Sequence, residues 1–304
     1  MSVKELYRAL YEIVGEDNII ENEPLAKHTT FRIGGPARYF LTPDSEEALK
    51  EVILMCKEHN IDFYVIGNGS NLLVSDKGYD GVVIKIGENL RKIRCEEDKI
   101  YATAGATLAG VAQTALKNSL TGFEFAAGIP GTLGGALVMN AGAYGGEMKL
   151  VVESAEVLDN EGNFIVLSNE ELELGYRKSV IPKKGYIVLS AVIKLDYTED
   201  KEAISARMSE LAAQRREKQP LEYPSAGSTF KRPEGYFAGK LIMDAGLRGY
   251  AIGGATVSEK HCGFVINKGG ATADDVIRLI EHVRATVLAK FGVELEPEVK
   301  LLGF

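Results

Sequence analysis

Residues 126–147, AAGIPGTLGGALVMNAGAYGGE, decide what the first half of this chain can be. Seven of these residues are glycine, although glycine makes up only 33 of the 304 residues of the whole chain. A segment with so few bulky side chains lets the backbone lie against a flat or extended ligand. Taken alone, the stretch could also be a series of tight turns in a β-rich domain.

A second glycine loop precedes it, VIGNGSNLLVSD at residues 65–76. Small residues in succession allow neighbouring backbone N–H groups to converge on one anion, and polar side chains add donors. The residues of this loop that could do so are Gly67, Asn68, Gly69, Ser70 and Asn71. Two such loops beside one set of strands favour a diphosphate with an attached ring system over two unrelated turns. Neither loop carries the lysine of a GxxxxGK[ST] motif, so nucleotide triphosphate hydrolysis has no support.

The surrounding elements indicate an α+β fold. Apolar residues at helical spacing predict helices over residues 1–17, 44–59, 107–119, 200–219 and 274–291. Extended patterns predict strands at 63–67, 72–76, 81–86, 99–105, 153–159, 163–168, 186–195 and 263–267. In the last of the helices we expect one apolar face made of Val276, Ile277, Ile280, Val283, Val287 and Leu288. The elements do not follow a steady βαβ alternation, which argues against a doubly wound sheet.

The composition of the sequence changes near residue 200, where a polar helix begins. We therefore expect a first domain at 1–200, in two parts divided near residue 60, and a second, smaller domain at 201–304. A chain of 304 residues is long enough for two or three domains of ordinary size.

Composition excludes several function classes. The net charge of −8 argues against a nucleic-acid partner, because such proteins need a basic face. The apolar runs fall far short of a membrane span. The three cysteines and four histidines show no pairing or metal-ligand spacing, so we expect no metal and reduced thiols in a cytoplasmic protein.

Seven motifs, in this order, resemble one enzyme family. They are FRIGGPA (31–37), GNGSNLLVSD (67–76), AGIPGTLGGALVMNAGAYGGE (127–147), GYRKS (175–179), AGSTFKRP (226–233), AGLRGYAIGGA (245–255) and LEPEVK (295–300). The set is similar to that of the UDP-N-acetylenolpyruvoylglucosamine reductases, also called UDP-N-acetylmuramate dehydrogenases. The glycine loops alone would indicate only the wider superfamily of FAD-binding domains of the vanillyl-alcohol oxidase type.

The resemblance implies that the first domain is a two-part FAD-binding domain of that type, followed by an α+β substrate-binding domain. It also implies that the loop from Gly67 to Asn71 holds the FAD pyrophosphate. Residues implied to line the flavin are Gly128, Ile129, Pro130, Gly131, Thr132, Gly134, Gly135, Asn140, Gly142 and Tyr144. The implied reaction uses NADPH to reduce the enolpyruvyl ether of UDP-N-acetylglucosamine to UDP-N-acetylmuramate, a precursor of peptidoglycan in the cell wall. The small-molecule partners would then be UDP-N-acetyl-3-O-(1-carboxyvinyl)-glucosamine and NADPH, and we expect both to use one cleft in turn.

Hydride addition to that ether places negative charge on an α-carbon conjugated to a carboxylate, and a proton must follow. By the resemblance, Arg177 clamps the carboxylate, Glu298 orients the cation or hydrogen-bonds the enediolate, and Ser228 protonates the α-carbon. Each residue also has a simpler interpretation. Arg177 could be an exposed loop arginine, Ser228 a backbone-capping residue in a turn, and Glu298 one of three alternating acids on an edge strand. Only the EPEV match favours Glu298 over its neighbour Glu296.

The UDP group requires cations and donors. Candidates by motif position are Tyr176, Lys218, Lys231, Arg232, Arg248, Tyr250 and His261. Only 50 residues lie between Arg177 and Ser228, so the chain is similar to the shorter subclass, which lacks an inserted substrate-covering tyrosine loop. Tyr176 or Tyr223 could cover the substrate instead.

We expect the protein to be a monomer. The sequence also leaves two other functions open. Another FAD-dependent oxidase or dehydrogenase would share both glycine loops but would not need the GYR, AGS and EPEV set. A catalytically idle nucleotide-sugar or flavin binder would be expected to lose Arg177, Ser228 or Glu298, and all three are present.

Overall fold

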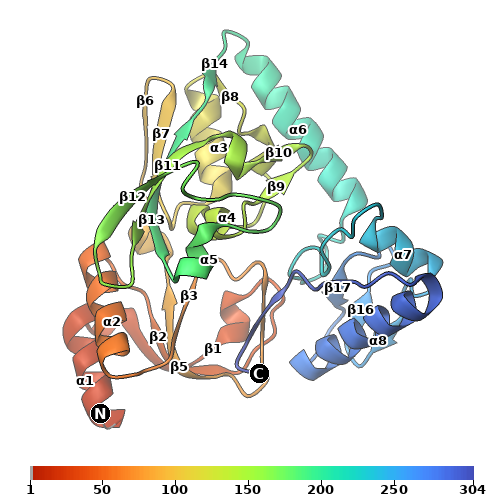
Figure 1. The fold of residues 1–304 in the computed structure, drawn as a ribbon, viewed down its shortest axis with the longest axis horizontal. Coiled ribbons are helices and arrows are strands. Elements are labelled where there is room, and N and C mark those ends of the chain that lie inside the picture. The colour runs from red at the N-terminus through yellow and green to blue at the C-terminus, as the bar shows by residue number, and fades with distance from the viewer. Residues whose placement is uncertain (1–2) are drawn as a thin grey trace. The chain divides into compact units, whose positions relative to one another are not determined.

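The structure is a computed structural model that describes residues 3–304, and it contains two compact units (Figure 1). The first unit comprises residues 3–21, 39–68 and 81–215, and the second comprises 22–38, 69–80 and 216–304. The chain therefore passes between the units several times. Among the described residues, no helix has both the length and the apolar character needed to cross a membrane.

The first unit combines helices with a five-stranded sheet and most of a four-stranded sheet, some residues of which belong to the second unit. The five-stranded sheet has the order β12-β11-β13-β7-β6, and the four-stranded sheet has the order β1-β2-β5-β3. Their strands are β1 Ile19–Pro24, β2 Pro36–Leu41, β3 Phe63–Ile66, β5 Tyr79–Lys85, β6 Ile93–Glu96, β7 Lys99–Thr103, β11 Val152–Leu158, β12 Phe164–Ser168 and β13 Ile187–Lys194. β8 Leu120–Thr121 pairs antiparallel with the distant β14 Asp196–Tyr197, and a short hairpin joins β9 Gly142–Ala143 to β10 Gly146–Glu147. The helices are α1 Val3–Val14, α2 Glu46–Glu58, α3 Leu108–Lys117, α4 Leu133–Val138, α5 Val180–Lys184 and α6 Lys201–Lys218, whose last turn enters the second unit.

Local sequence explains these elements. Helix α2 begins after Ser45, whose hydroxyl accepts the amide of Ala48, and it buries Leu49 and Ile53 in the core. The neighbouring strands β11 and β12 pair antiparallel, as the DNEG turn predicts. The long strand β13 lies between β11 and β7 in the middle of its sheet, which explains its nearly continuous apolar sequence.

The second unit packs two helices with short strands. Its elements are β4 Leu72–Val74, α7 Ala238–Asp244, β15 Ala251–Ile252, β16 Ala255–Val257, β17 Val265–Asn267, α8 Ala273–Phe291 and β18 Lys300–Leu302. Strand β18 runs parallel to β4, so the end of the chain lies beside the segment that follows the first glycine loop. Helix α8 begins with a capping box between Thr272 and Asp275.

Two sequence-based expectations differ from the structure. The boundary expected near residue 200 falls instead within α6, between Arg215 and Arg216, because Ile204, Met208 and Leu211 of this helix pack in the first unit. The division expected near residue 60 does not separate the sheets, because β3 and β5 join β1 and β2.

Candidate active site

The two glycine loops lie against each other in the first unit. The side-chain amide of Asn68 donates to the carbonyl of Pro130, with Nδ2···O at 3.1 Å. A methyl group added at Gly67 would lie 2.3 Å from Oγ1 of Thr132, so only glycine permits this approach. The structure thus brings together two segments that the sequence separates by about 60 residues. This contact fits a ligand held by both loops at once.

The N-terminus of α4, within the second glycine loop, has no free amides in its first turn. The amide of Leu133 donates to Ala106, at 2.8 Å, and the amide of Gly134 donates to Ala104, at 3.0 Å. The third amide, of Gly135, lies 3.5 Å from the capping hydroxyl of Thr132. Gly134 therefore serves close packing, and the exposed neighbours Gly128, Pro130 and Gly135 are the parts of this loop open to a ligand.

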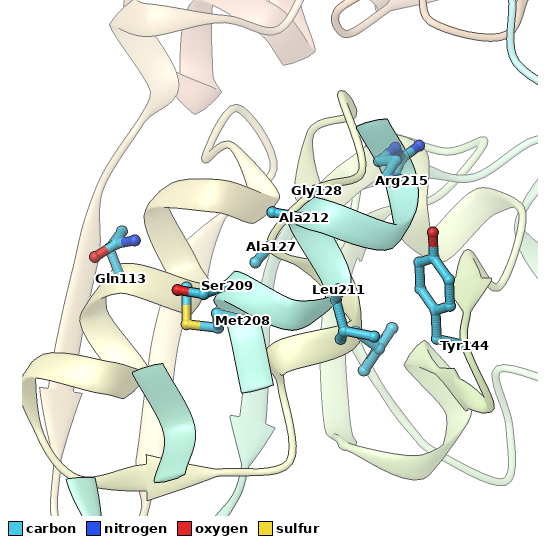
Figure 2. A pocket seen from close by; sticks show the side chains of 10 residues that line it. Gln113, Ala127, Gly128, Tyr144, Met208, Ser209, Leu211, Ala212 and Arg215 are labelled. Carbon is cyan, nitrogen blue, oxygen red and sulfur yellow. The ribbon is translucent and has the colours of Figure 1, made fainter. Parts of the chain in front are cut away.

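A cavity of about 260 Å³ opens beside this loop, within the first unit (Figure 2). It is lined from α3, the glycine loop, the β9–β10 turn and α6 by Gln113, Phe125, Ala127, Gly128, Tyr144, Met208, Ser209, Leu211, Ala212 and Arg215. Two of the predicted flavin-lining residues, Gly128 and Tyr144, therefore share one hollow.

Tyr144 reaches the cavity from a strained turn. Tyr144 and Gly145 connect β9 to β10 and both have positive φ, 52° and 87°, as in a type I′ hairpin turn. Such a conformation is unfavourable for a bulky residue and is found most often at functional sites. In Figure 2 the hydroxyl end of Tyr144 points toward the side of the cavity where Arg215 lies.

Arg215 is a residue of this site that the sequence analysis missed. A methyl group on Gly128 would lie 3.2 Å from both Cδ and Nη1 of Arg215, so the arginine covers the glycine backbone. Burial lowers the pKa of the guanidinium, which nevertheless stays charged at neutral pH. It gives the cavity a cation suited to an electron-rich ring or an anion. The signal in the sequence was weak, because Arg215 lies in a helix that is polar on all sides.

Arg177 stands on a tight turn. Gly175 and Lys178 exchange backbone hydrogen bonds of 3.0 and 3.1 Å, which leaves Tyr176 and Arg177 at the tip. Arg177 has a positive φ of 54°, and its guanidinium carbon lies 5.1 Å from the centre of the Tyr176 ring. Tyr176 is 52% exposed. The turn thus holds Arg177, which is partly buried, in a conformation that is uncommon for non-glycine residues.

Asn140, one of the residues predicted to line the flavin, uses its side chain for contacts within the protein. Its side chain has no exposed surface, and its amide is committed to Glu147, Gly175 and the backbone of Lys149. Gly142, at the start of the same hairpin, packs against the backbone of Gly146.

In the second unit, the Ser228 and Glu298 segments run side by side. The amide of Glu298 donates to the carbonyl of Thr229, at 2.8 Å, and the amide of Lys231 donates to that of Glu296, at 2.9 Å. Ser228 and Glu298 are both partly exposed, whereas Thr229 is buried and its hydroxyl accepts the amide of Val265. The chain thus fixes the backbone next to both predicted catalytic residues.

The first glycine loop also reaches this place. The side-chain amide of Asn71 donates to the carbonyl of Glu298, at 3.1 Å, and the amide of Lys300 donates to the carbonyl of Asn71, at 2.9 Å. Gly69 has a positive φ of 59° and lies against the backbone of His28, where a methyl group would come within 2.2 Å of its carbonyl oxygen. Ser70 is partly exposed between them.

The three acidic residues near the end of the chain, Glu294, Glu296 and Glu298, do not all make the same kind of contact. Glu294 pairs with Arg284, at 3.1 Å, and Glu296 pairs with the ammonium group of Lys231. Glu298 forms neither of these two pairs. The charge of Lys231, a predicted substrate-binding residue, is therefore balanced by Glu296.

The remaining predicted substrate residues all belong to the second unit, apart from Tyr176. Lys218 is exposed at the end of α6, and Arg248 is exposed with its guanidinium near the sulfur of Met243. Arg232 lies over the ring of Phe237, at 4.0 Å, and Tyr250 stacks on the ring of His282, at 4.4 Å.

His261 is neutral at its position. Burial lowers the pKa of its imidazole, and Nδ1 accepts the amide of Gly263 at 3.1 Å. The other ring nitrogen, Nε2, therefore carries the proton and can only donate a hydrogen bond. His261 can contact an anionic substrate as a donor, but it does not add a positive charge.

Comparisons with known proteins agree with this arrangement. A family model described as "UDP-N-acetylenolpyruvoylglucosamine reductase, C-terminal domain" matches residues 219–302, and one described as "FAD binding domain" matches residues 37–168. These matches confirm the expected FAD cofactor and the expected order of an FAD-binding domain followed by a smaller domain.

Whole-chain relatives extend the likeness. The chain is 57% identical over 300 residues to the UDP-N-acetylenolpyruvoylglucosamine reductase of Clostridium beijerinckii, with 99% of this chain and 97% of the relative covered. It is 56% identical over 294 residues to that of Caldanaerobacter subterraneus subsp. tengcongensis, with 97% of each covered. The crystal structure of the enzyme from Thermus caldophilus superposes with a TM-score of 0.80 at 38% identity, covering 93% of this chain and 98% of the other. The sequence, the α+β fold and the site residues thus lead to one conclusion: this chain belongs to the family of UDP-N-acetylenolpyruvoylglucosamine reductases, FAD-containing oxidoreductases of peptidoglycan precursor synthesis.

Proposed function

We propose that this protein uses NADPH to reduce the enolpyruvyl ether of UDP-N-acetylglucosamine to UDP-N-acetylmuramate, with Ser228 as the proton donor. The observation that best supports the proposal is the pairing of the Ser228 and Glu298 segments, in which the Glu298 amide bonds the Thr229 carbonyl. Two residues that lie 70 positions apart in the sequence are thereby held on adjacent backbones, and both are accessible.

The cofactor fits the residues that are present. The approach of Gly67 to Thr132 forms a cradle that any side chain would fill, and the 260 Å³ cavity offers an aromatic ring and a cation beside exposed glycine backbone. We assign the pyrophosphate to the loop from Gly67 to Asn71, and the flavin to the surroundings of Gly128 and Tyr144. When bound, FAD supplies the hydride that adds to the terminal carbon of the enol ether.

The chain's own residues carry out the remaining steps. Arg177 binds the substrate carboxylate and offsets the negative charge that grows there as the double bond is reduced. The Ser228 hydroxyl gives its proton to the α-carbon, and the resulting alkoxide takes a proton back from solvent. An alcohol is a weak acid, but a carbanion-like centre is a strong base, so position matters more than acidity.

Glu298 acts on the carboxylate end of the substrate. The amide of Glu298 bonds Thr229 and the carbonyl of Glu298 bonds Asn71. These two bonds fix the backbone from which the Glu298 side chain extends. When protonated, the Glu298 carboxyl donates a hydrogen bond to the enediolate oxygens. When ionised, it orients the cation that binds them.

The test separates the two half-reactions. We expect Ser228→Ala to keep flavin reduction by NADPH while it slows reoxidation by the enolpyruvyl sugar nucleotide roughly 10²–10⁴-fold, as is usual for loss of a general acid. Stopped-flow absorbance of the flavin, recorded without oxygen, measures both rates. Wild-type reoxidation in this variant would remove Ser228 from the mechanism. If wild-type protein is bleached by NADPH but is not reoxidised by the sugar nucleotide, it is another FAD-dependent oxidoreductase.

Steady-state inhibition tests whether the two substrates share a site. We propose that NADPH and the sugar nucleotide bind alternately, so each should inhibit competitively against the other. A ternary complex would refute this part of the proposal.

A further inference from the structure

Asn140 lies at a junction of three segments in the first unit. One side-chain N–H group donates to Oε2 of Glu147, at 3.0 Å, and the other to the carbonyl of Gly175, at 3.1 Å. Its side-chain oxygen accepts the amide of Lys149, at 2.8 Å. The Asn140 side chain has no exposed surface, although its partner residues are partly or fully exposed. A buried amide group that loses its hydrogen-bond partners is costly, because no solvent reaches it to replace them.

The bond to Gly175 supports the turn that carries Arg177. Gly175 is the first residue of that turn, and its carbonyl also accepts the amide of Lys178. Arg177 has a positive φ of 54°. A non-glycine residue holds such a conformation only when its surroundings impose it. The Asn140 amide is one such support, and the Ser179 hydroxyl, which donates to the carbonyl of Val138 at 2.8 Å, is another just beyond the turn.

Asn140 is also suited to this place by its own backbone. Its φ of 44° is in the left-handed region, which asparagine tolerates better than most residues. The bond to Glu147 ties it to the hairpin that presents Tyr144 to the cavity. One residue thus connects the cavity-lining hairpin with the Arg177 turn.

We infer that Asn140 is a positioning residue for Arg177 and not a ligand of the flavin. It acts by holding the Gly175 carbonyl, and with it the direction of the arginine toward the substrate carboxylate. This inference rests on the role proposed above for Arg177. A misplacement of about 1 Å at a group that binds the reacting molecule can cost 10²-fold in rate.

The replacement Asn140→Asp tests the inference in the FAD-loaded enzyme. It keeps the size and the tolerance for positive φ but removes both donors and places a carboxyl group against Glu147 and the Gly175 carbonyl. We expect flavin reduction by NADPH and FAD affinity to stay within about threefold of wild type, and reoxidation by the enolpyruvyl sugar nucleotide to slow roughly 10–100-fold. Equal slowing of both half-reactions, or loss of FAD, would show a general structural role and overturn the inference.

A matched control and a milder variant complete the test. Asn169 also donates to two backbone carbonyls in the first unit, at 2.9 and 2.6 Å, but neither belongs to the Arg177 turn. Asn169→Asp should therefore lower stability without separating the half-reactions. Ser179→Ala, which removes the second support, should slow reoxidation in the same direction but less, and it serves where Asn140→Asp does not fold. Unchanged reoxidation in Ser179→Ala together with a misfolded Asn140→Asp would also overturn the inference.

A double-mutant cycle identifies the route of the effect. If Asn140 acts through Arg177, then Asn140→Asp in an Arg177→Ala background should slow reoxidation by no more than about threefold further, because the group it positions is absent. A full additional loss would mean that Asn140 acts elsewhere. If Arg177→Ala itself leaves reoxidation unchanged, the proposed role of Arg177 fails and the inference falls with it. If Arg177→Ala slows reoxidation while Asn140→Asp does not, only the inference fails.

Discussion

Replacing Gly67 with alanine should separate the two glycine loops of the first unit. The added methyl group would lie 2.3 Å from Oγ1, 3.2 Å from Cγ2 and 3.3 Å from Cβ of Thr132. Real Cβ atoms do not approach other atoms to 2.3 Å, so either the loop at residues 65–68 moves away or the Thr132 side chain rotates. Thr132 is 3% exposed, which leaves it little room.

Both responses carry a cost that can be estimated. Rotation of Thr132 removes the hydroxyl that caps α4, and loss of such a cap usually costs about 1 kcal/mol. Overpacking of a buried contact costs typically 1–3 kcal/mol. We therefore expect Gly67→Ala to lower the free energy of unfolding by about 1–3 kcal/mol. FAD binding should weaken as well, because the methyl group enlarges the gap between the loops that hold the cofactor.

The double variant Gly67→Ala/Thr132→Ala tests the stated cause. It removes the nearest atom, Oγ1, and also Cγ2, so the clash is relieved although the cap is lost. We expect the double variant to be more stable than the sum of the single effects by about 1 kcal/mol or more, as found for residues in contact. Urea unfolding and FAD titration measure the two consequences, and Gly87→Ala is the control, since its methyl group would meet only the Lys85 side chain at 3.5 Å. Additive single effects would refute the steric explanation.

Four further outcomes are expected in the second unit. Thr272→Ala removes the capping box of α8 and should cost about 1 kcal/mol of stability in urea unfolding, which a null effect would contradict. Hydrogen bonds from the backbone amide of Thr272 and from other donors lower the pKa of the Asp275 carboxyl in the folded protein. Its contribution to stability is therefore complete above the unfolded-state pKa of about 3.9 and is lost as the pH falls through the lower pKa of the folded state. The stability difference between wild type and Asp275→Asn in urea unfolding should therefore be present near neutral pH and shrink as the pH falls below about 3.9. Burial lowers the pKa of His261, so NMR titration of its ring should give a pKa below about 6.5. A higher pKa would mean that His261 can make a charged contact with the substrate. The exposed Lys231–Glu296 pair should be worth less than about 1 kcal/mol, so Glu296→Gln should change stability little.

The secondary structure was largely predictable because local patterns determine it. The apolar spacing in α2 and α8 and the DNEG turn all correspond to elements at the expected places. The errors come from tertiary packing. In α8, Leu288 was expected on the buried face but is 50% exposed, whereas Leu279 was not expected there and is fully buried. The buried stripe runs through Ile280, Val283 and Val287, and Leu288 lies about 100° around the helix from Val287.

The site was predictable where backbone motifs carry it, and less so where long-range contacts decide. The two glycine loops could be recognised from their runs of glycine, and the Ser228 segment from its resemblance to a family motif. Arg215 could not, because it is one of several charged residues in a polar helix and only its contact with Gly128 marks it. The choice of Glu298 over Glu296 came from the EPEV match, and the structure adds only that Glu296 pairs with Lys231.

Two asparagines from the predicted cofactor loops show what the sequence alone could not reveal. In the first unit Asn140 donates to the carbonyl of Gly175, and in the second Asn71 donates to the carbonyl of Glu298. Each amide thus supports the backbone of a segment that carries a proposed catalytic residue. Glycine gives these loops a backbone that a ligand can approach, while asparagine supplies a donor long enough to reach a neighbouring segment. The loops would then have two separable tasks, so replacing Asn140 should impair substrate reduction more than FAD binding, whereas replacing Gly67 should do the reverse.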